Sequence, residues 1–98
     1  MNERKAISLR VGERLRALRV AAGLTQQQVA ERTSKHRPLV CRLEKGVHQQ
    51  RLDQILAFAR AVGVKPSEIL MVLDEPIVLD ETDRRMIADC SDPSDGDF

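Results

Sequence analysis

The chain has 98 residues, of which 42% are hydrophobic and 32% carry a charge. This length suits one small domain with a modest core, and the lack of Trp and Tyr requires that core to be mostly aliphatic. No apolar run approaches the ~20 residues of a membrane span, and the first ten residues lack the apolar stretch of a secretory signal. We therefore expect a cytoplasmic protein with no membrane partner.

The two cysteines, Cys41 and Cys90, lie far apart and lack the paired spacing of a zinc site. We expect free thiols in a reducing compartment, with no metal and no cofactor. The sequence also lacks a glycine-rich phosphate loop and any spacing that pairs a nucleophile with its base. An enzyme is therefore not expected.

Positive and negative charges are divided between two parts of the chain. Residues 1–73 contain 14 Lys and Arg against 6 Asp and Glu, a net charge of +8. Residues 74–98 contain 2 against 9, a net charge of −7. A basic domain attracts a polyanion, and an acidic segment is repelled by one. The alternative is that the charges only form an ordinary solvated surface with an acidic tail that aids solubility. We expect a domain over residues 1–73 and an acidic extension over residues 74–98.

Gly23, Gly46 and Gly63 each follow a stretch with helical apolar spacing, and glycine is preferred just after a helix end. These signals, with Pro66 as a helix start, predict helices over residues 8–22, 25–33, 37–45, 51–62 and 66–73. No alternating strand pattern occurs before residue 76. The predicted fold class is therefore all-α, with five short helices.

The start of the second predicted helix has a capping box, in which Thr25 and Gln28 satisfy free N–H groups. Pro38 falls in the first turn of the third helix, where a proline is tolerated. Apolar spacings of three and four residues predict the buried face of each helix. The expected core residues are Ile7, Val11, Leu15, Leu18, Ala22, Val29, Ala30, Val40, Leu43, Leu52, Ile55, Leu56, Ala59, Val62, Ile69, Leu70 and Leu73.

The acidic extension has weaker signals. The apolar run at residues 77–79 predicts a short strand, and residues 82–89 predict a helix with a weak apolar face. The polar end after it is expected to be mobile.

Residues 24–46 read LTQQQVAERTSKHRPLVCRLEKG and predict two short helices joined by a tight turn. Polar and basic side chains open the second helix, which is the layout of a helix-turn-helix that enters the major groove of DNA. Residues 8–73 resemble the lambda-repressor-like, Cro/XRE-type helix-turn-helix domains. The segments that match are LTQQQVAER, VCRLEKG and LDQILAFARAVGVKPSEIL.

The resemblance implies two sets of DNA contacts. Base edges are expected to meet Arg37, Pro38, Leu39 and Arg42, because Arg bonds guanine O6 and N7 together and an apolar side chain suits a thymine methyl group. Leu39 has the alternative of being an ordinary exposed leucine. Phosphate contacts are expected from Gln26, Lys35, His36, Lys45, Gly46, His48, Gln49 and Arg51.

The resemblance also implies an ion pair between Arg19 and Glu44 that orients the second motif helix, with Gln26 bracing it as well. An unpaired Glu44 and a merely solvated Gln26 are the alternatives. The turn Thr33-Ser34-Lys35 departs from the family, which usually has an apolar residue, Gly and another apolar residue there. A strained backbone at Ser34 is therefore expected, and Lys35 is unusually polar for its position.

Three other features also depart from the family pattern: Cys41 replaces a small polar residue, Pro38 stiffens the helix tip, and the loop before the fourth helix lacks the frequent Pro and Ser/Thr cap.

The leading hypothesis is a sequence-specific transcriptional regulator, a homodimeric repressor of a palindromic operator in double-stranded DNA. Its dimer contact is expected from residues 77–79 or from the fifth helix. The alternative is an antitoxin or phage-type adaptor whose acidic tail binds a protein partner.

Overall fold

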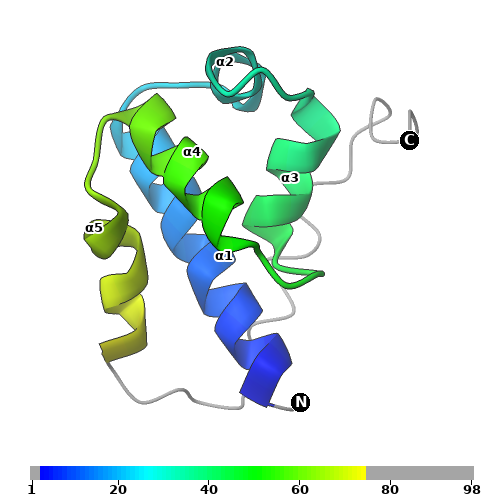
Figure 1. Cartoon of the computed structure of the whole chain (residues 1–98), viewed down its shortest axis with the longest axis vertical. Helices are drawn as coiled ribbons and strands as arrows, with labels where there is room; N and C mark the ends of the chain where they lie inside the picture. The colour runs from blue at the N-terminus through cyan, green and yellow to red at the C-terminus, as the bar shows by residue number, and fades with distance from the viewer. Residues whose placement is uncertain (1–2, 75–98) are drawn as a thin grey trace.

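The computed structural model describes residues 3–74, which form a helical bundle (Figure 1). Its elements in chain order are α1 (Glu3–Ala21), α2 (Gln26–Arg32), α3 (Arg37–Lys45), α4 (Leu52–Val62), α5 (Pro66–Leu70) and the 3₁₀ helix η1 (Met71–Asp74). Five α-helices and no strand in this part of the chain confirm the predicted fold class. The strand and helix expected at 77–79 and 82–89, and Cys90, lie outside the described residues.

The helix boundaries differ from the prediction mainly at the two ends of the bundle. α1 begins at Glu3 rather than at residue 8, because its apolar spacing continues backwards through the fully buried Ala6. α5 ends at Leu70, and the chain continues as a 3₁₀ turn rather than as an α-helix. Within residues 3–74, no helix is both long enough and apolar enough to cross a membrane.

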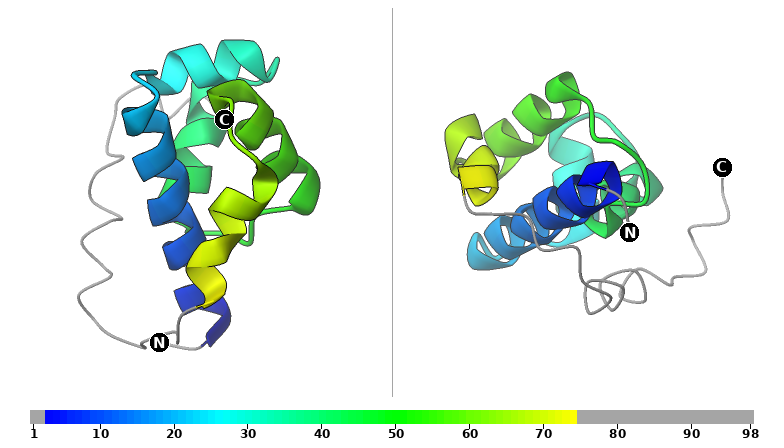
Figure 2. Two further views of the ribbon diagram at one scale, coloured as in Figure 1. Left: turned by 90° about the vertical axis from the view of Figure 1, so that its left-hand side faces the viewer. Right: turned by 90° about the horizontal axis from the view of Figure 1, so that it is seen from below.

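α1 is the longest helix, and the other elements pack around it. α3 lies along one side of α1 and the α5–η1 segment along the other, as the views in Figures 1 and 2 show. α4 contacts α1 and α5, and α2 closes one end of the bundle against α3 and α4. The helix α3 is therefore held by α1, and the helix α2 is held by α4.

The core is aliphatic apart from Phe58, which is fully buried. Four predicted core residues are exposed: Ala22, which follows the end of α1, and Leu52, Leu56 and Leu73. Three others, Ile7, Leu18 and Leu70, are partly buried against the core. The apolar stripe of α4 is wider than the surface that α1, α2 and α5 cover, so part of it faces solvent. The buried apolar residues are Ala6, Leu9, Val11, Leu15, Val29, Ala30, Val40, Cys41, Leu43, Ile55, Phe58, Ala59, Ala61, Val62 and Ile69.

The backbones of α1 and α3 approach closely at two glycines. A Cβ atom on Gly12 of α1 would overlap the carbonyl oxygen of Glu44, and one on Gly46 would overlap that of Ser8. Gly46 also ends α3 with a φ of 67°, a left-handed conformation that glycine adopts without strain. The position of α3 on α1 is thus set by main-chain contact.

Candidate nucleic-acid interface

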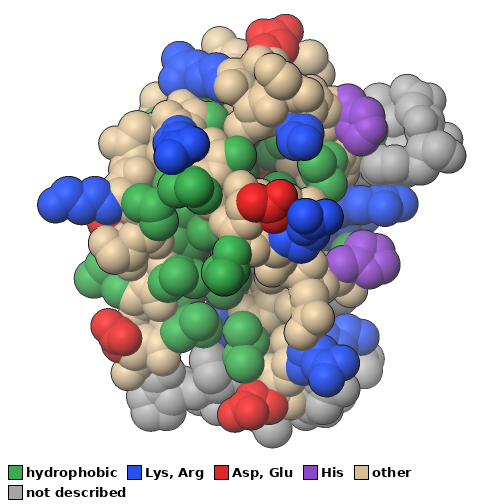
Figure 3. Space-filling model, in the orientation of Figure 1, with side chains coloured by type: hydrophobic (Ala, Val, Ile, Leu, Met, Phe, Trp, Pro, Cys, Tyr) green, Lys and Arg blue, Asp and Glu red, His purple; other side chains and the backbone are tan. Residues whose placement is uncertain are grey.

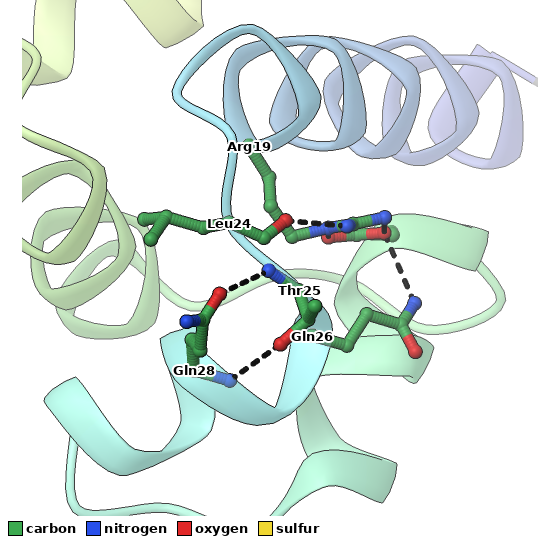
Figure 4. Close-up of polar contacts among 6 residues, drawn as sticks. Arg19, Leu24, Thr25, Gln26 and Gln28 are labelled. Carbon is green, nitrogen blue, oxygen red and sulfur yellow. Dashed lines mark hydrogen bonds and ion pairs between the residues drawn. The ribbon is translucent and has the colours of Figure 1, made fainter.

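A tight turn joins α2 to α3. The predicted capping box at the start of α2 is present, since Thr25 Oγ1 accepts from the N–H of Gln28, and Gln28 Oε1 accepts from that of Thr25 (Figure 4). At the other end, Ser34 has a φ of 57° and the N–H of Lys35 donates to the carbonyl oxygen of Ala30 at 2.8 Å. This is a Schellman-type helix end with serine where glycine is usual, so the expected strain at Ser34 is confirmed.

A buried polar network fixes α3 to α1 and α2. Arg19 Nε donates to Glu44 Oε2 at 2.6 Å and Arg19 Nη2 donates to Glu44 Oε1 at 3.1 Å. Gln26 Nε2 donates to the same Oε1 at 3.1 Å, and Arg19 Nη1 donates to the carbonyl oxygen of Leu24 at 2.9 Å (Figure 4). The Glu44 side chain is 1% exposed and that of Arg19 is 12% exposed. The expected pair therefore exists as a bidentate, nearly dry contact, the geometry in which such bonds are strongest.

Only a narrow stripe of α3 faces solvent. Arg42 is exposed and Arg37 is half-buried, in keeping with the outward positions expected for them. The expectation that Pro38 also points outward is wrong, because Pro38 is buried. Leu39 is half-buried like Arg37 and packs against the core with part of its side chain, so its base contact stays a prediction. Leu39 lies one helical turn before the buried Leu43, which places both on the same face of α3.

The loop after α3 is anchored by the side chain of Gln50. Gln50 Nε2 donates to the carbonyl oxygens of Ser8 at 2.8 Å and of Leu43 at 3.1 Å, which joins the loop to α1 and to the end of α3. No sequence signal indicated this anchoring role of Gln50. Gly46 is buried and its N–H donates to the carbonyl oxygen of Arg42, so the expectation of a Gly46 phosphate contact is wrong.

The remaining expected contact residues lie on one side of the bundle. Figure 3 shows Lys, Arg and His side chains along its right-hand edge, over α3 and the loop that follows it. The exposed members of the expected set are Lys35, His36, Arg42, His48, Gln49 and Arg51, and Gln26, Arg37 and Lys45 are partly buried. Arg51 pairs with Asp53 in a solvent-exposed contact of 3.1 Å.

A polar hollow at the start of α2 brings residues of α1, α2 and α3 together. Gln26 and Arg37 both line it, as do Arg16 and Gln27, which were not among the expected contact residues. The only sequence signal for Arg16 is that it falls off the apolar stripe of α1.

Among residues 3–74 no group of three His, Cys, Asp or Glu side chains is placed to hold a metal ion. Cys41 is buried.

The family model described as "Helix-turn-helix domain" matches residues 10–70, which is more than half of the chain. The chain belongs to this helix-turn-helix family. The match confirms the predicted family and places α2 and α3 inside the matched region.

Relatives of this helix-turn-helix chain include two sequences and one solved structure. The control protein C.BamHI of Bacillus amyloliquefaciens is 29% identical over 65 residues, 65% of this chain and 80% of that protein. An uncharacterized HTH-type transcriptional regulator of Methanothermobacter thermautotrophicus is 38% identical over 61 residues, 62% of this chain and 88% of that protein. The crystal structure of the restriction-modification controller protein C.AhdI from Aeromonas hydrophila has a TM-score of 0.66 and 34% identity, covering 69% of this chain and 99% of that one.

Proposed function

We propose that this protein is a sequence-specific transcriptional regulator that inserts α3 into the major groove of double-stranded DNA. The observation that carries the proposal is the network of Arg19, Gln26 and Glu44, which holds α3 rigidly while Arg42 stays exposed. The names of the relatives support this class of function. A helix fixed in advance loses little conformational freedom on binding, which favours affinity.

The structure narrows the residues suited to each kind of contact. Arg37 and Arg42 are the base readers, because they are the two members of the original base set that are not packed into the core. Each has the two-pronged donor geometry that recognises guanine. The phosphate contacts come from Gln26, Lys35, His36, Lys45, His48, Gln49 and Arg51, which carry no sequence information themselves.

The protein binds DNA as a homodimer in this proposal, because one helix reads only about four or five base pairs. The surface suited to the second copy is the exposed apolar face formed by Leu52, Leu56, Met71 and Leu73. Leu52 is 75% exposed and Met71 is 53% exposed, and Figure 3 shows hydrophobic side chains at the surface over α4 and the α5–η1 segment. Exposed apolar surface of this kind often marks a protein–protein contact. Two copies joined through this face act on a palindromic operator as a repressor.

A narrower candidate is the control of restriction-modification genes. The similarity to C.AhdI, at 34% identity over nearly all of that chain, favours it. In this case the operator lies upstream of the gene for this protein or of neighbouring restriction and methylation genes. Footprinting of the purified protein on that upstream DNA, compared with a distant segment of equal length, tests this version separately.

The main experiment is selection of bound sequences from a random double-stranded DNA library at fixed salt. A palindromic consensus with half-sites about one helical turn apart is the expected result. Arg42→Ala should cost about 1–3 kcal/mol on the consensus and relax the preference at one base, while Arg60→Ala, an exposed arginine at the end of α4, should leave both unchanged. Binding with a salt slope but no consensus would contradict sequence-specific recognition.

The dimer face has its own test. Leu52→Asp should convert a dimer to a monomer in sedimentation equilibrium, because a charge is desolvated in an apolar contact. Val20→Asp is the matched control, since Val20 is an exposed valine on α1 outside this face. A dimer that survives Leu52→Asp and Met71→Asp together places the second copy elsewhere.

A further inference from the structure

The expected DNA contacts are strongly basic, and the acidic residues near them are largely neutralised within the domain. Glu44 is buried in its contact with Arg19, and Asp53 pairs with Arg51. Lys35, Arg42 and the two histidines are exposed, and Figure 3 shows Lys, Arg and His side chains gathered over α3 and the loop that follows it. This surface, defined by Lys35, His36, Arg37, Arg42, Lys45, His48 and Arg51, is called the basic face below.

The same chain carries its own polyanion. Nine of its 15 acidic residues occur in residues 74–98, which contain only 2 Lys and Arg. Seven acidic residues fall within residues 80–97. This density of negative charge makes the segment a polyanion, and the basic face attracts a polyanion electrostatically.

The acidic segment can reach the basic face. The described part ends at Asp74, and the 24 residues that follow span at most about 80 Å when extended. The bundle is only 33 Å along its longest axis. A tethered segment of this length has an effective concentration on the order of 1 mM at surfaces within its reach, so even weak attraction produces substantial occupancy.

We propose that residues 80–97 contact the basic face of their own chain and compete with the phosphates of DNA. The inference rests on the proposed function, because it assigns the same face to both ligands. DNA must displace the segment before it binds, so the segment lowers the affinity for every DNA sequence by the same factor. The bound segment also makes DNA binding less sensitive to salt, because it has already displaced part of the counterions from the basic face.

The first test compares the full chain with a full-length variant whose acidic segment is neutral. The probe is a mixed-sequence DNA duplex of about 20 base pairs, measured at several salt concentrations between about 50 and 200 mM. The neutral variant should bind about threefold to tenfold more tightly at low salt and show a steeper salt slope. Its substitutions are Asp80→Asn, Glu81→Gln, Asp83→Asn, Asp89→Asn, Asp92→Asn, Asp95→Asn and Asp97→Asn.

The second test separates contact from long-range repulsion. A zero-length carbodiimide reagent joins a carboxylate to a lysine only where the two touch, and the products are identified by mass spectrometry. Tail carboxylates should join Lys35 and Lys45 on the basic face more often than Lys5 and Lys65, which lie outside it. An excess of the DNA duplex should suppress the first pair of products and spare the second.

Equal cross-linking of all four lysines, or an affinity that does not rise on neutralisation, overturns the proposal. A lower affinity of the neutral variant also overturns it, since the segment would then support DNA binding or dimer formation. These outcomes differ from failure of the proposed function, in which neither the full chain nor the neutral variant binds DNA.

Discussion

Removal of the Arg19 charge tests the role assigned to the buried network. Arg19→Met keeps most of the side-chain volume but removes both guanidinium hydrogen bonds from the Glu44 carboxylate, which is 1% exposed and keeps the hydrogen bond from Gln26. Breaking a buried pair by removing one partner costs about 3–5 kcal/mol, because the other charge stays desolvated. A domain of this size has a free energy of unfolding of about 5–15 kcal/mol, so a large share of it should be lost.

Thermal and urea unfolding of the full chain measure this loss. The melting temperature should fall by at least about 12 °C, and the urea midpoint should fall with an unchanged slope. Asp53→Asn is the control, because its pair with Arg51 is 68–74% exposed and should contribute less than about 1 kcal/mol.

A double variant, Arg19→Met with Glu44→Gln, should be more stable than Arg19→Met alone because no unpaired charge remains. If Arg19→Met costs no more than Asp53→Asn does, then the network does not hold α3 and the reasoning fails.

Three further variants test other contacts of the bundle. Gly12→Ala should destabilise the fold by about 2–3 kcal/mol in urea unfolding, because the new Cβ overlaps the backbone of Glu44; a smaller loss would show that α1 and α3 can separate at little cost. Ser34→Gly should raise the free energy of unfolding by about 0.5–1 kcal/mol, since glycine relieves the left-handed strain, and an unchanged melting temperature would count against that strain. Gln50→Ala should cost about 1–3 kcal/mol and weaken DNA binding on all sequences, because two carbonyl oxygens lose their donor; a changed base preference would instead implicate Gln50 in base reading.

The local signals in the sequence predicted the motif well. Each of these signals depends on residues that are close in the chain. The structure contains the capping box of Thr25 and Gln28 and the left-handed glycines after α3 and α4. The strain at Ser34 was predictable from the family resemblance, because serine stands where the family usually has glycine.

The exposed surface of α3 was harder to predict, because it depends on how many helices pack around it. α3 contacts both α1 and α2, so its buried face is wide and includes Pro38 and Cys41 as well as Val40 and Leu43. The apolar stripe taken from Val40 and Leu43 alone was therefore too narrow. The opposite error occurred in α4, where Leu52 fits the stripe but no helix covers it.

The main-chain contact of α1 with α3 has a consequence for how the target sequence of this protein can change. Because Gly12, Gly46 and buried side chains such as Glu44 fix the pose of α3, that pose does not depend on which residues face outward. In the proposed function, a substitution at Arg42 then alters the base that is read while the helix stays in register with the groove. New target preferences become accessible one exposed side chain at a time, in evolution or by engineering, without rebuilding the scaffold.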